Sequence, residues 1–97
     1  MSITVTLTFS IRPDRVDEFT SLLGNLLPDT RAYDGCLNVD VYQDQDSPGT
    51  ITLLEDWSSK QHQQKYQTWR DESGIADVLG PFLAGEPSFS YMDRLDI

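Results

Sequence analysis

Residues 2–11 alternate strictly between hydroxyl-bearing and apolar side chains, and this pattern constrains the fold more than any other in the chain. Every even position is serine or threonine, and the odd positions are Ile3, Val5, Leu7, Phe9 and Ile11. A period of two is that of a β-strand, whose successive side chains point to opposite faces. We therefore predict a strand with one apolar face, which another layer must cover, and one hydroxyl-bearing face.

The pattern then changes to the period of a helix. Arg12-Pro13-Asp14 marks the end of the strand, and a proline suits the first turn of a helix. The apolar positions that follow fall on one helix face: Val16, Phe19, Leu22, Leu23, Leu26 and Leu27. Gly24 and Pro28 weaken the far end. We expect a kink or a restart at Pro28, because a proline inside a helix removes a hydrogen bond.

Two further strands and a hairpin follow. Tyr33-Asp34-Gly35 is typical of a turn, and residues 36–44 alternate between apolar and polar side chains. The polar loop at 45–49 contains Pro48-Gly49, which favours a hairpin to an antiparallel strand at 50–57.

A second helix and a last strand complete the pattern. Ser58 with Gln61 three residues later has the form of a capping box, which predicts a helix over about 59–73 that ends at Gly74. Short helical turns are expected within 75–87, closing over something apolar, and a last strand at 88–95. The order β-α-β-β-α-β is the ferredoxin-like arrangement. The predicted fold class is α+β, with helices on one face of a four-stranded antiparallel sheet.

Length and charge restrict the possible partners. The 97 residues are enough for a single domain, 1–97. Sixteen acidic and seven basic residues give a formal charge of −9, which argues against nucleic acid and against an anionic membrane surface as partners. No apolar run approaches the roughly 18 residues of a membrane span. The first residues lack the pattern of a signal peptide, and Cys36 is the single cysteine, so we expect a cytoplasmic protein.

The second face of the predicted sheet suggests a homodimer. It would mix apolar and polar side chains: Thr4, Thr6, Thr8, Tyr42, Thr52, Leu54 and Met92. Such a face is too apolar for water and too polar for an ordinary core. Packing against the same face of a second copy would cover it.

Candidate site residues gather where the third strand passes into the second helix. This stretch holds both tryptophans, Trp57 and Trp69, and the only histidine, His62. His62, Tyr66 and Trp69 recur at the spacing of one helix face. His62 or Tyr66 could exchange a proton with a phenol, and Trp57 could orient a substrate oxygen. The alternative is that these aromatic side chains, Trp57 included, only pack in the core.

Other side chains give weaker signals. Arg70 or Arg31 could steady an anionic oxygen, although most arginines form surface pairs. Glu55 and Asp56 are adjacent in a strand and should point to opposite faces, so they cannot form a carboxylate pair. One histidine and one cysteine do not make a zinc or iron site, and no phosphate-binding glycine loop occurs. We therefore expect no metal and no cofactor, with redox chemistry carried by the substrate itself.

Several short segments resemble the antibiotic biosynthesis monooxygenase domain family. They are the initial alternating strand with the segment 12–19 that ends it, then 34–37, 41–44 and Leu54-Glu55-Asp56-Trp57-Ser58-Ser59, and the resemblance covers nearly the whole chain. The resemblance implies a dimeric α+β barrel of ferredoxin-like protomers. It also implies oxidation of phenols or quinols without flavin, haem or metal, although other members degrade haem, isomerise small sugars or have no known activity.

The same resemblance places two further positions in the site. Tyr66 stands nine residues after Trp57, where quinol-oxidising members often carry a histidine. Leu53 stands four residues before Trp57, where some polyketide-oxidising members carry an asparagine. Haem-degrading members use a histidine of the second helix as axial ligand, and His62 lies one turn before that position.

Three functions follow from these observations. The first is a cofactor-independent monooxygenase acting on a quinol or polycyclic phenol, with His62, Trp57 and Tyr66 as catalytic residues and Trp69, Arg70 and Leu53 as substrate-binding residues. The second is a non-catalytic dimeric module that binds a small aromatic compound. The third is an isomerase of a small metabolite, which would need a pocket richer in charge.

Overall fold

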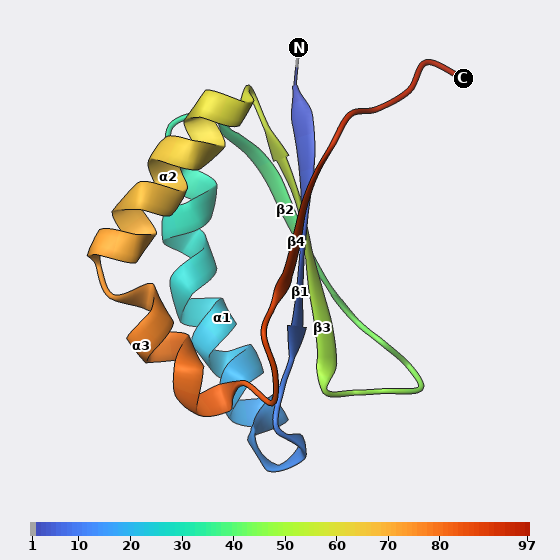
Figure 1. Ribbon diagram of the computed structural model, residues 1–97, viewed down its shortest axis with the longest axis vertical. Helices are drawn as coiled ribbons and strands as arrows, with labels where there is room; N and C mark the ends of the chain where they lie inside the picture. The colour runs from blue at the N-terminus through green and yellow to red at the C-terminus, as the bar shows by residue number, and fades with distance from the viewer. Residues whose placement is uncertain (1) are drawn as a thin grey trace.

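The computed structural model describes residues 2–97 and confirms the predicted order of elements (Figure 1). The strands are β1 (Ile3–Ser10), β2 (Cys36–Gln43), β3 (Thr50–Trp57) and β4 (Ser88–Met92). The main helices are α1 (Val16–Ala32) and α2 (Lys60–Glu72), followed by the short α3 (Ile75–Leu79). Single turns of 3-10 helix stand at Pro13–Arg15 and Gly80–Phe82.

The four strands form one antiparallel sheet in the order β2-β3-β1-β4. Its register puts Val5 opposite Glu55 and Tyr91, and Thr6 opposite Leu54 and Ser90. Because side chains alternate along each strand, the odd residues of β1 share a face with the odd residues of β3 and β4. The fold is the predicted α+β, ferredoxin-like one.

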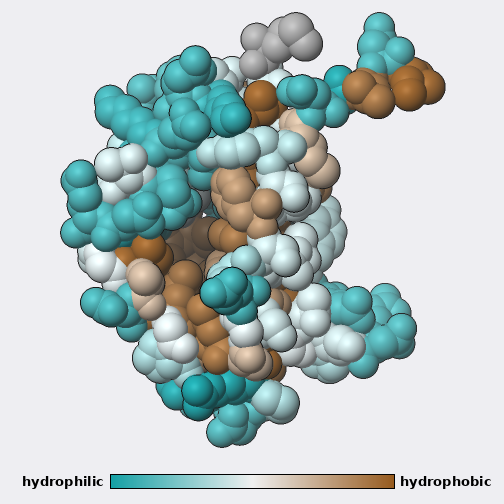
Figure 2. Space-filling model, in the orientation of Figure 1, coloured by the Kyte–Doolittle hydropathy of each residue, from teal (hydrophilic) through white to brown (hydrophobic). Residues whose placement is uncertain are grey.

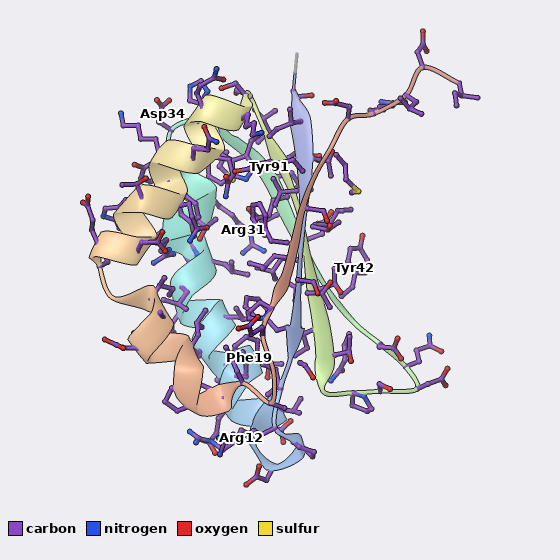
Figure 3. All side chains as sticks on the ribbon, viewed as in Figure 1. Arg12, Phe19, Arg31, Asp34, Tyr42 and Tyr91 are labelled. Atoms are coloured by element: carbon purple, nitrogen blue, oxygen red, sulfur yellow. The ribbon has the colours of Figure 1, made fainter. Side chains whose placement is uncertain are left out.

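The helices lie on one face of this sheet, and the core fills the space between the two layers (Figure 1). Phe19, Leu23 and Leu27 of α1 are buried against Phe9 and other residues of the sheet. Figure 3 shows Phe19 on the helical side of the sheet and Tyr42 on the opposite side. A smaller cluster around Val5, Trp57 and Tyr66 joins the sheet to α2.

The far face of the sheet has the mixed composition expected from the sequence. The register aligns Thr4 with Asp56 and Met92, and Thr8 with Thr52. Thr4 donates a hydrogen bond to Asp56 at 2.8 Å. No helix within residues 2–97 covers that face (Figure 1).

The predicted cap of the second helix, Ser58, and the predicted end of the last strand were wrong. The helix begins at Lys60 with Ser59 as its cap, because the Ser58 amide donates to the Gly35 carbonyl and the Ser59 hydroxyl accepts from the His62 amide. The last strand ends at Met92 rather than at residue 95, because its pairing with β1 runs from Ser88 opposite Thr8 to Met92 opposite Thr4 and is not continued.

Pro28 does not interrupt the first helix. α1 runs from Val16 to Ala32 as one element, so the expected restart does not occur. Leu27 and Thr30 are buried on either side of the proline. Their packing offsets the one backbone hydrogen bond that the proline cannot make.

Candidate functional site

A cavity of about 370 Å³ lies between the sheet and the helices. Most of its walls are apolar side chains from β1, β3, β4, α1 and α3, among them Leu7, Leu23, Leu53, Leu79 and Phe89. Figure 2 shows a hollow with hydrophobic walls on the face where β4 lies opposite the helices. Its volume falls within the range of roughly 300–1,000 Å³ that small-molecule pockets occupy.

A buried carboxyl, Glu55, forms part of this lining. It comes from the helix-facing side of β3 and is only 4% exposed. The Trp57 indole donates to Glu55 Oε1 at 2.9 Å. Burial raises the pKa of Glu55 above its usual value, and the Trp57 hydrogen bond partly opposes this rise. The cavity therefore contains an acid that is a stronger base than an exposed glutamate.

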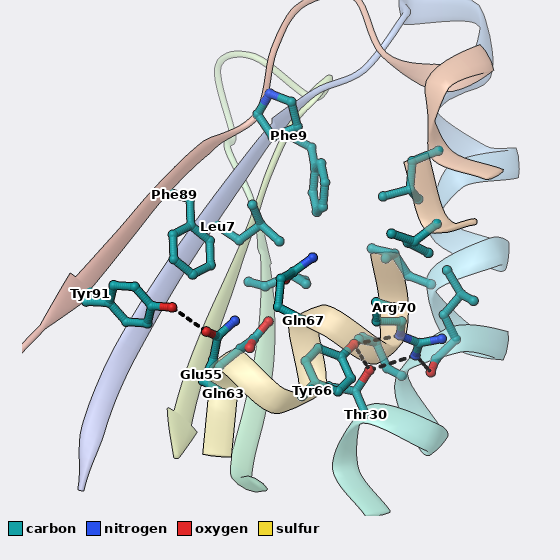
Figure 4. Close-up of a pocket in the computed structure, with 17 residues that line it drawn as sticks. Leu7, Phe9, Thr30, Glu55, Gln63, Tyr66, Gln67, Arg70, Phe89 and Tyr91 are labelled. Carbon is teal, nitrogen blue, oxygen red and sulfur yellow. Dashed lines mark hydrogen bonds between the residues drawn. The ribbon is translucent and has the colours of Figure 1, made fainter. Parts of the chain in front are cut away.

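An amide and a phenol continue the polar part of the lining. Gln63 of α2 is buried, and its Oε1 accepts from the Tyr91 hydroxyl at 2.5 Å. This bond joins α2 to the edge strand β4. In Figure 4 the Glu55 and Gln63 side chains lie between Tyr91 and Tyr66.

The other polar wall is a network around Arg70, which is 7% exposed. Its Nε donates to the Tyr66 hydroxyl at 2.8 Å. Its Nη2 donates to the Leu26 carbonyl at 2.8 Å and to Thr30 Oγ1 at 3.0 Å. Within residues 2–97 no carboxylate lies within ion-pair distance of this guanidinium. A buried positive charge without an acidic partner favours an anion in the neighbouring cavity.

Tyr66 belongs to the same network. Its hydroxyl lies 2.7 Å from Thr30 Oγ1, and its ring packs against Trp57 with centroids 5.0 Å apart. Burial raises the pKa of Tyr66, and the hydrogen bonds to Arg70 and Thr30 partly oppose this. Tyr66 is therefore a neutral hydrogen-bonding group near pH 7, and ionising it would cost free energy.

The structure brings three of the six predicted site residues to the cavity and leaves three outside its lining. Tyr66, Arg70 and Leu53 line it. Trp57 is fully buried behind Glu55, and Trp69 stacks on Tyr33 with centroids 5.4 Å apart.

His62 lies at the start of α2, outside the lining of the cavity. Its Nδ1 is 2.6 Å from the Ser59 hydroxyl, and its Nε2 is 3.8 Å from Asp34 at the surface. His62, Tyr66 and Trp69, which stand at i, i+4 and i+7 on the helix, therefore do not line one common cavity.

Sequence reasoning did not select Glu55, Gln63 or Tyr91 for the site. A signal for Glu55 was present, since it alternates with Leu53 and Trp57 and must share their covered face. Gln63 and Tyr91 gave no such signal, because only the packing of α2 against β4 brings them together.

Two classes of feature are absent from the described part of the chain. Residues 2–97 hold no cluster of three or more histidine, cysteine or carboxylate side chains placed to bind a metal ion. None of the helices within this range combines the length and apolar character of a membrane span.

Comparison with known proteins identifies the fold and the family. The structure resembles a conserved protein from Methanosarcina mazei (TM-score 0.87, 24% identity, 98% of this chain and 94% of that one). It also resembles Rv0793 from Mycobacterium tuberculosis (TM-score 0.86, 25% identity, 100% and 98%). A third similar structure is an antibiotic biosynthesis monooxygenase (TM-score 0.83, 21% identity, 98% and 99%).

The search of curated proteins gave no match. The family model for antibiotic biosynthesis monooxygenase matches residues 2–76, which is most of the chain and includes β1 to α2. The chain belongs to the antibiotic biosynthesis monooxygenase family.

Proposed function

We propose that this protein is a monooxygenase that oxidises an electron-rich phenol or quinol with O2 in the cavity between the sheet and α2. Family membership supports the reaction class. The observation that carries the proposal is the cavity itself: apolar walls, a buried acid at Glu55, and the buried cation Arg70 without an acidic partner among the described residues. Such a site suits an aromatic compound that becomes an anion.

In the proposed reaction the substrate supplies all the electrons. Loss of a proton gives an anion that transfers electrons to O2. One oxygen atom is inserted into a C–H bond, and the other leaves as water with two hydrogens from the substrate. A hydroquinone would thus become a hydroxyquinone. An anthrone would become an anthraquinone.

The chain's own residues would contribute orientation and electrostatics. Apolar side chains such as Leu7 and Phe89 exclude water, which strengthens every charge interaction in the cavity. The Arg70 guanidinium favours the substrate anion, and its bonds to Tyr66, Leu26 and Thr30 fix its position.

We also propose that the protein acts as a homodimer in the cytoplasm. The far face of the sheet carries Leu54, Met92 and Tyr42 among threonines, and the latter two are exposed. Contact with the same face of a second copy would cover them and leave the cavity, on the helical face, open to substrate.

The test is O2 uptake with a panel of hydroquinones and anthrones, corrected for spontaneous oxidation. Leu53→Phe should fill the cavity and lower uptake at least tenfold, whereas Leu37→Phe, on the exposed edge strand, should not change it. Uptake no faster than spontaneous oxidation for every compound would falsify the proposal.

A binding module for small aromatic compounds is the second candidate, and the same cavity supports it. It predicts saturable binding of the panel, weakened by Leu53→Phe, with no consumption of O2. An isomerase is disfavoured, because the charged lining of the cavity is confined to Glu55 and Arg70 within the described residues.

A further inference from the structure

One oxygen of the buried Glu55 carboxyl is free. Oε1 accepts the indole N–H of Trp57, while Oε2 makes no hydrogen bond to any side chain or backbone group of residues 2–97. Oε2 is therefore not fully enclosed by protein atoms, and the Glu55 side chain lines the cavity. The carboxyl is therefore held at one oxygen by Trp57, and its side chain lies at the cavity, where Figure 4 shows it.

We propose that Glu55 is the base that removes the phenolic proton, with Oε2 as the accepting atom. This inference rests on the proposed monooxygenase function and names a catalytic residue for it. A phenol in the cavity can donate its O–H to Oε2 while its ring lies against Leu7 and Phe89. The oxygen that becomes negative would then lie in the same cavity as the Arg70 guanidinium.

The surroundings of Glu55 suit this role. Tyr66 on α2 and Cys36 on β2 lie near enough to interact with its charge, and Arg70 and Tyr91 line the same cavity. No cation among the described residues pairs with the carboxylate. Burial raises the pKa of Glu55 toward that of a phenol, so the proton transfer becomes less unfavourable.

The proton transfer balances without any other group. The phenolic O–H bond breaks, its electron pair stays on the phenolate oxygen, and the proton forms an O–H bond to Oε2. O2 then accepts electrons from the phenolate. The proton held by Glu55 leaves in the water that carries away the second oxygen atom.

His62 is placed less well for this step. The His62 imidazole is hydrogen-bonded to the Ser59 hydroxyl and is directed toward the exposed Asp34. The His62 side chain does not line the cavity. A His62→Ala variant therefore separates the two candidate bases.

The experiment measures phenolate formation and proton release when 4-nitrophenol binds, with no O2 chemistry involved. It is done below the pKa of the free probe, in weak buffer with a pH indicator. If Glu55 accepts the proton, the bound probe shows its phenolate absorption with almost no proton released to the buffer. His62→Ala and Asp56→Asn should behave in the same way, since Asp56 points to the far face of the sheet.

Glu55→Gln keeps an oxygen for the Trp57 N–H but cannot accept a proton. It should either bind the probe as neutral phenol or release one proton for each phenolate formed. Release of one proton per phenolate by the wild-type protein, or binding only of neutral phenol, would overturn the inference. Equal behaviour of Glu55→Gln and wild type would also overturn it.

The outcome is separable from that of the proposed function. A positive result with the probe and no O2 uptake from any quinol would keep Glu55 as a proton acceptor and remove the oxygenase. Uptake in the wild type with no loss in Glu55→Gln would keep the oxygenase and remove Glu55. In the expected case, Glu55→Ala lowers uptake by roughly 100-fold or more, and added acetate restores part of it.

Discussion

Arg70 donates a hydrogen bond from its Nε to the hydroxyl of Tyr66, one helical turn earlier on α2, at a distance of 2.8 Å. The same guanidinium reaches across to Thr30 and to the Leu26 carbonyl on α1. One side chain therefore ties the two main helices together at the wall of the cavity. Removing the Arg70 side chain should therefore lower both the stability of the fold and the affinity of the cavity for a ligand.

Replacing Arg70 with methionine should lower the free energy of unfolding by roughly 1–3 kcal/mol. The apolar side chain removes a buried charge, but it also removes the hydrogen bonds that Arg70 donates to the buried Tyr66 and Thr30 hydroxyls, and that loss is the larger effect. Urea denaturation of Arg70→Met measures the change. Arg94→Met, at an exposed position, should lie within about 0.5 kcal/mol of wild type. An Arg70→Met protein as stable as wild type would show that the network contributes little.

Trp57→Phe should raise the pKa of Glu55 further. The indole N–H donates to the carboxylate and is the one influence that lowers this pKa, whereas phenylalanine keeps a ring but has no donor. The pH at which activity rises, or at which the bound phenol becomes phenolate, should therefore move upward. Tyr33→Phe, also a ring in contact with Trp57, serves as the control and should leave this midpoint unchanged. A downward shift in Trp57→Phe would contradict the prediction.

Glu55→Gln should gain stability over wild type as the pH rises. The folded-state pKa of Glu55 lies above its unfolded value, so the folded form holds its proton more tightly than the unfolded form. The wild-type protein therefore loses stability as the pH rises from the unfolded pKa through the folded one, by about 1.4 kcal/mol per unit of difference. Glutamine has no such dependence. Urea denaturation of both proteins from about pH 4, near the ordinary pKa of a glutamate, up to about pH 8 tests this. A constant difference between them would mean that burial does not perturb Glu55.

Gly35→Ala should destabilise the protein by roughly 1–3 kcal/mol. Gly35 has φ +88°, where a side chain is strained, and an added Cβ would collide with the ring of His62. The substitution should therefore disturb the turn that leads into β2 and the start of α2. Thermal unfolding compares it with Gly85→Ala, where no heavy atom lies within 4 Å of the added Cβ. Equal melting temperatures would refute the predicted collision.

Leu54→Asp should convert a dimer into a monomer. Leu54 lies on the far face of β3, paired with Thr6 and Asp40, at the centre of the face proposed to contact a second copy. A carboxylate buried there in each subunit would meet its like-charged counterpart. Sedimentation velocity measures the change, with Thr68→Asp on the exposed face of α2 as control. Wild-type protein that sediments as a monomer would remove the proposed interface.

The sequence alone determined the elements and their order, because hydrophobic period is a local property. The alternation in residues 2–11 required a strand with one covered face, and the apolar stripe at 16–27 required a helix to cover it. The cap predicted at Ser58 and the strand end predicted at Leu95 were wrong. A cap and a strand end depend on partners far away in the chain, here Gly35 and the start of β1.

The tertiary structure decided which polar groups share the cavity. Helical spacing grouped His62, Tyr66 and Trp69, but the tilt and rotation of α2 turn Tyr66 and Arg70 to the cavity lining and leave His62 near the surface. Glu55, Gln63 and Tyr91 come from β3, α2 and β4, and nothing local joins them. The spacing of side chains along a helix or strand follows from its local backbone geometry. The composition of a cavity depends on how separate helices and strands pack, and only the folded chain fixes that packing.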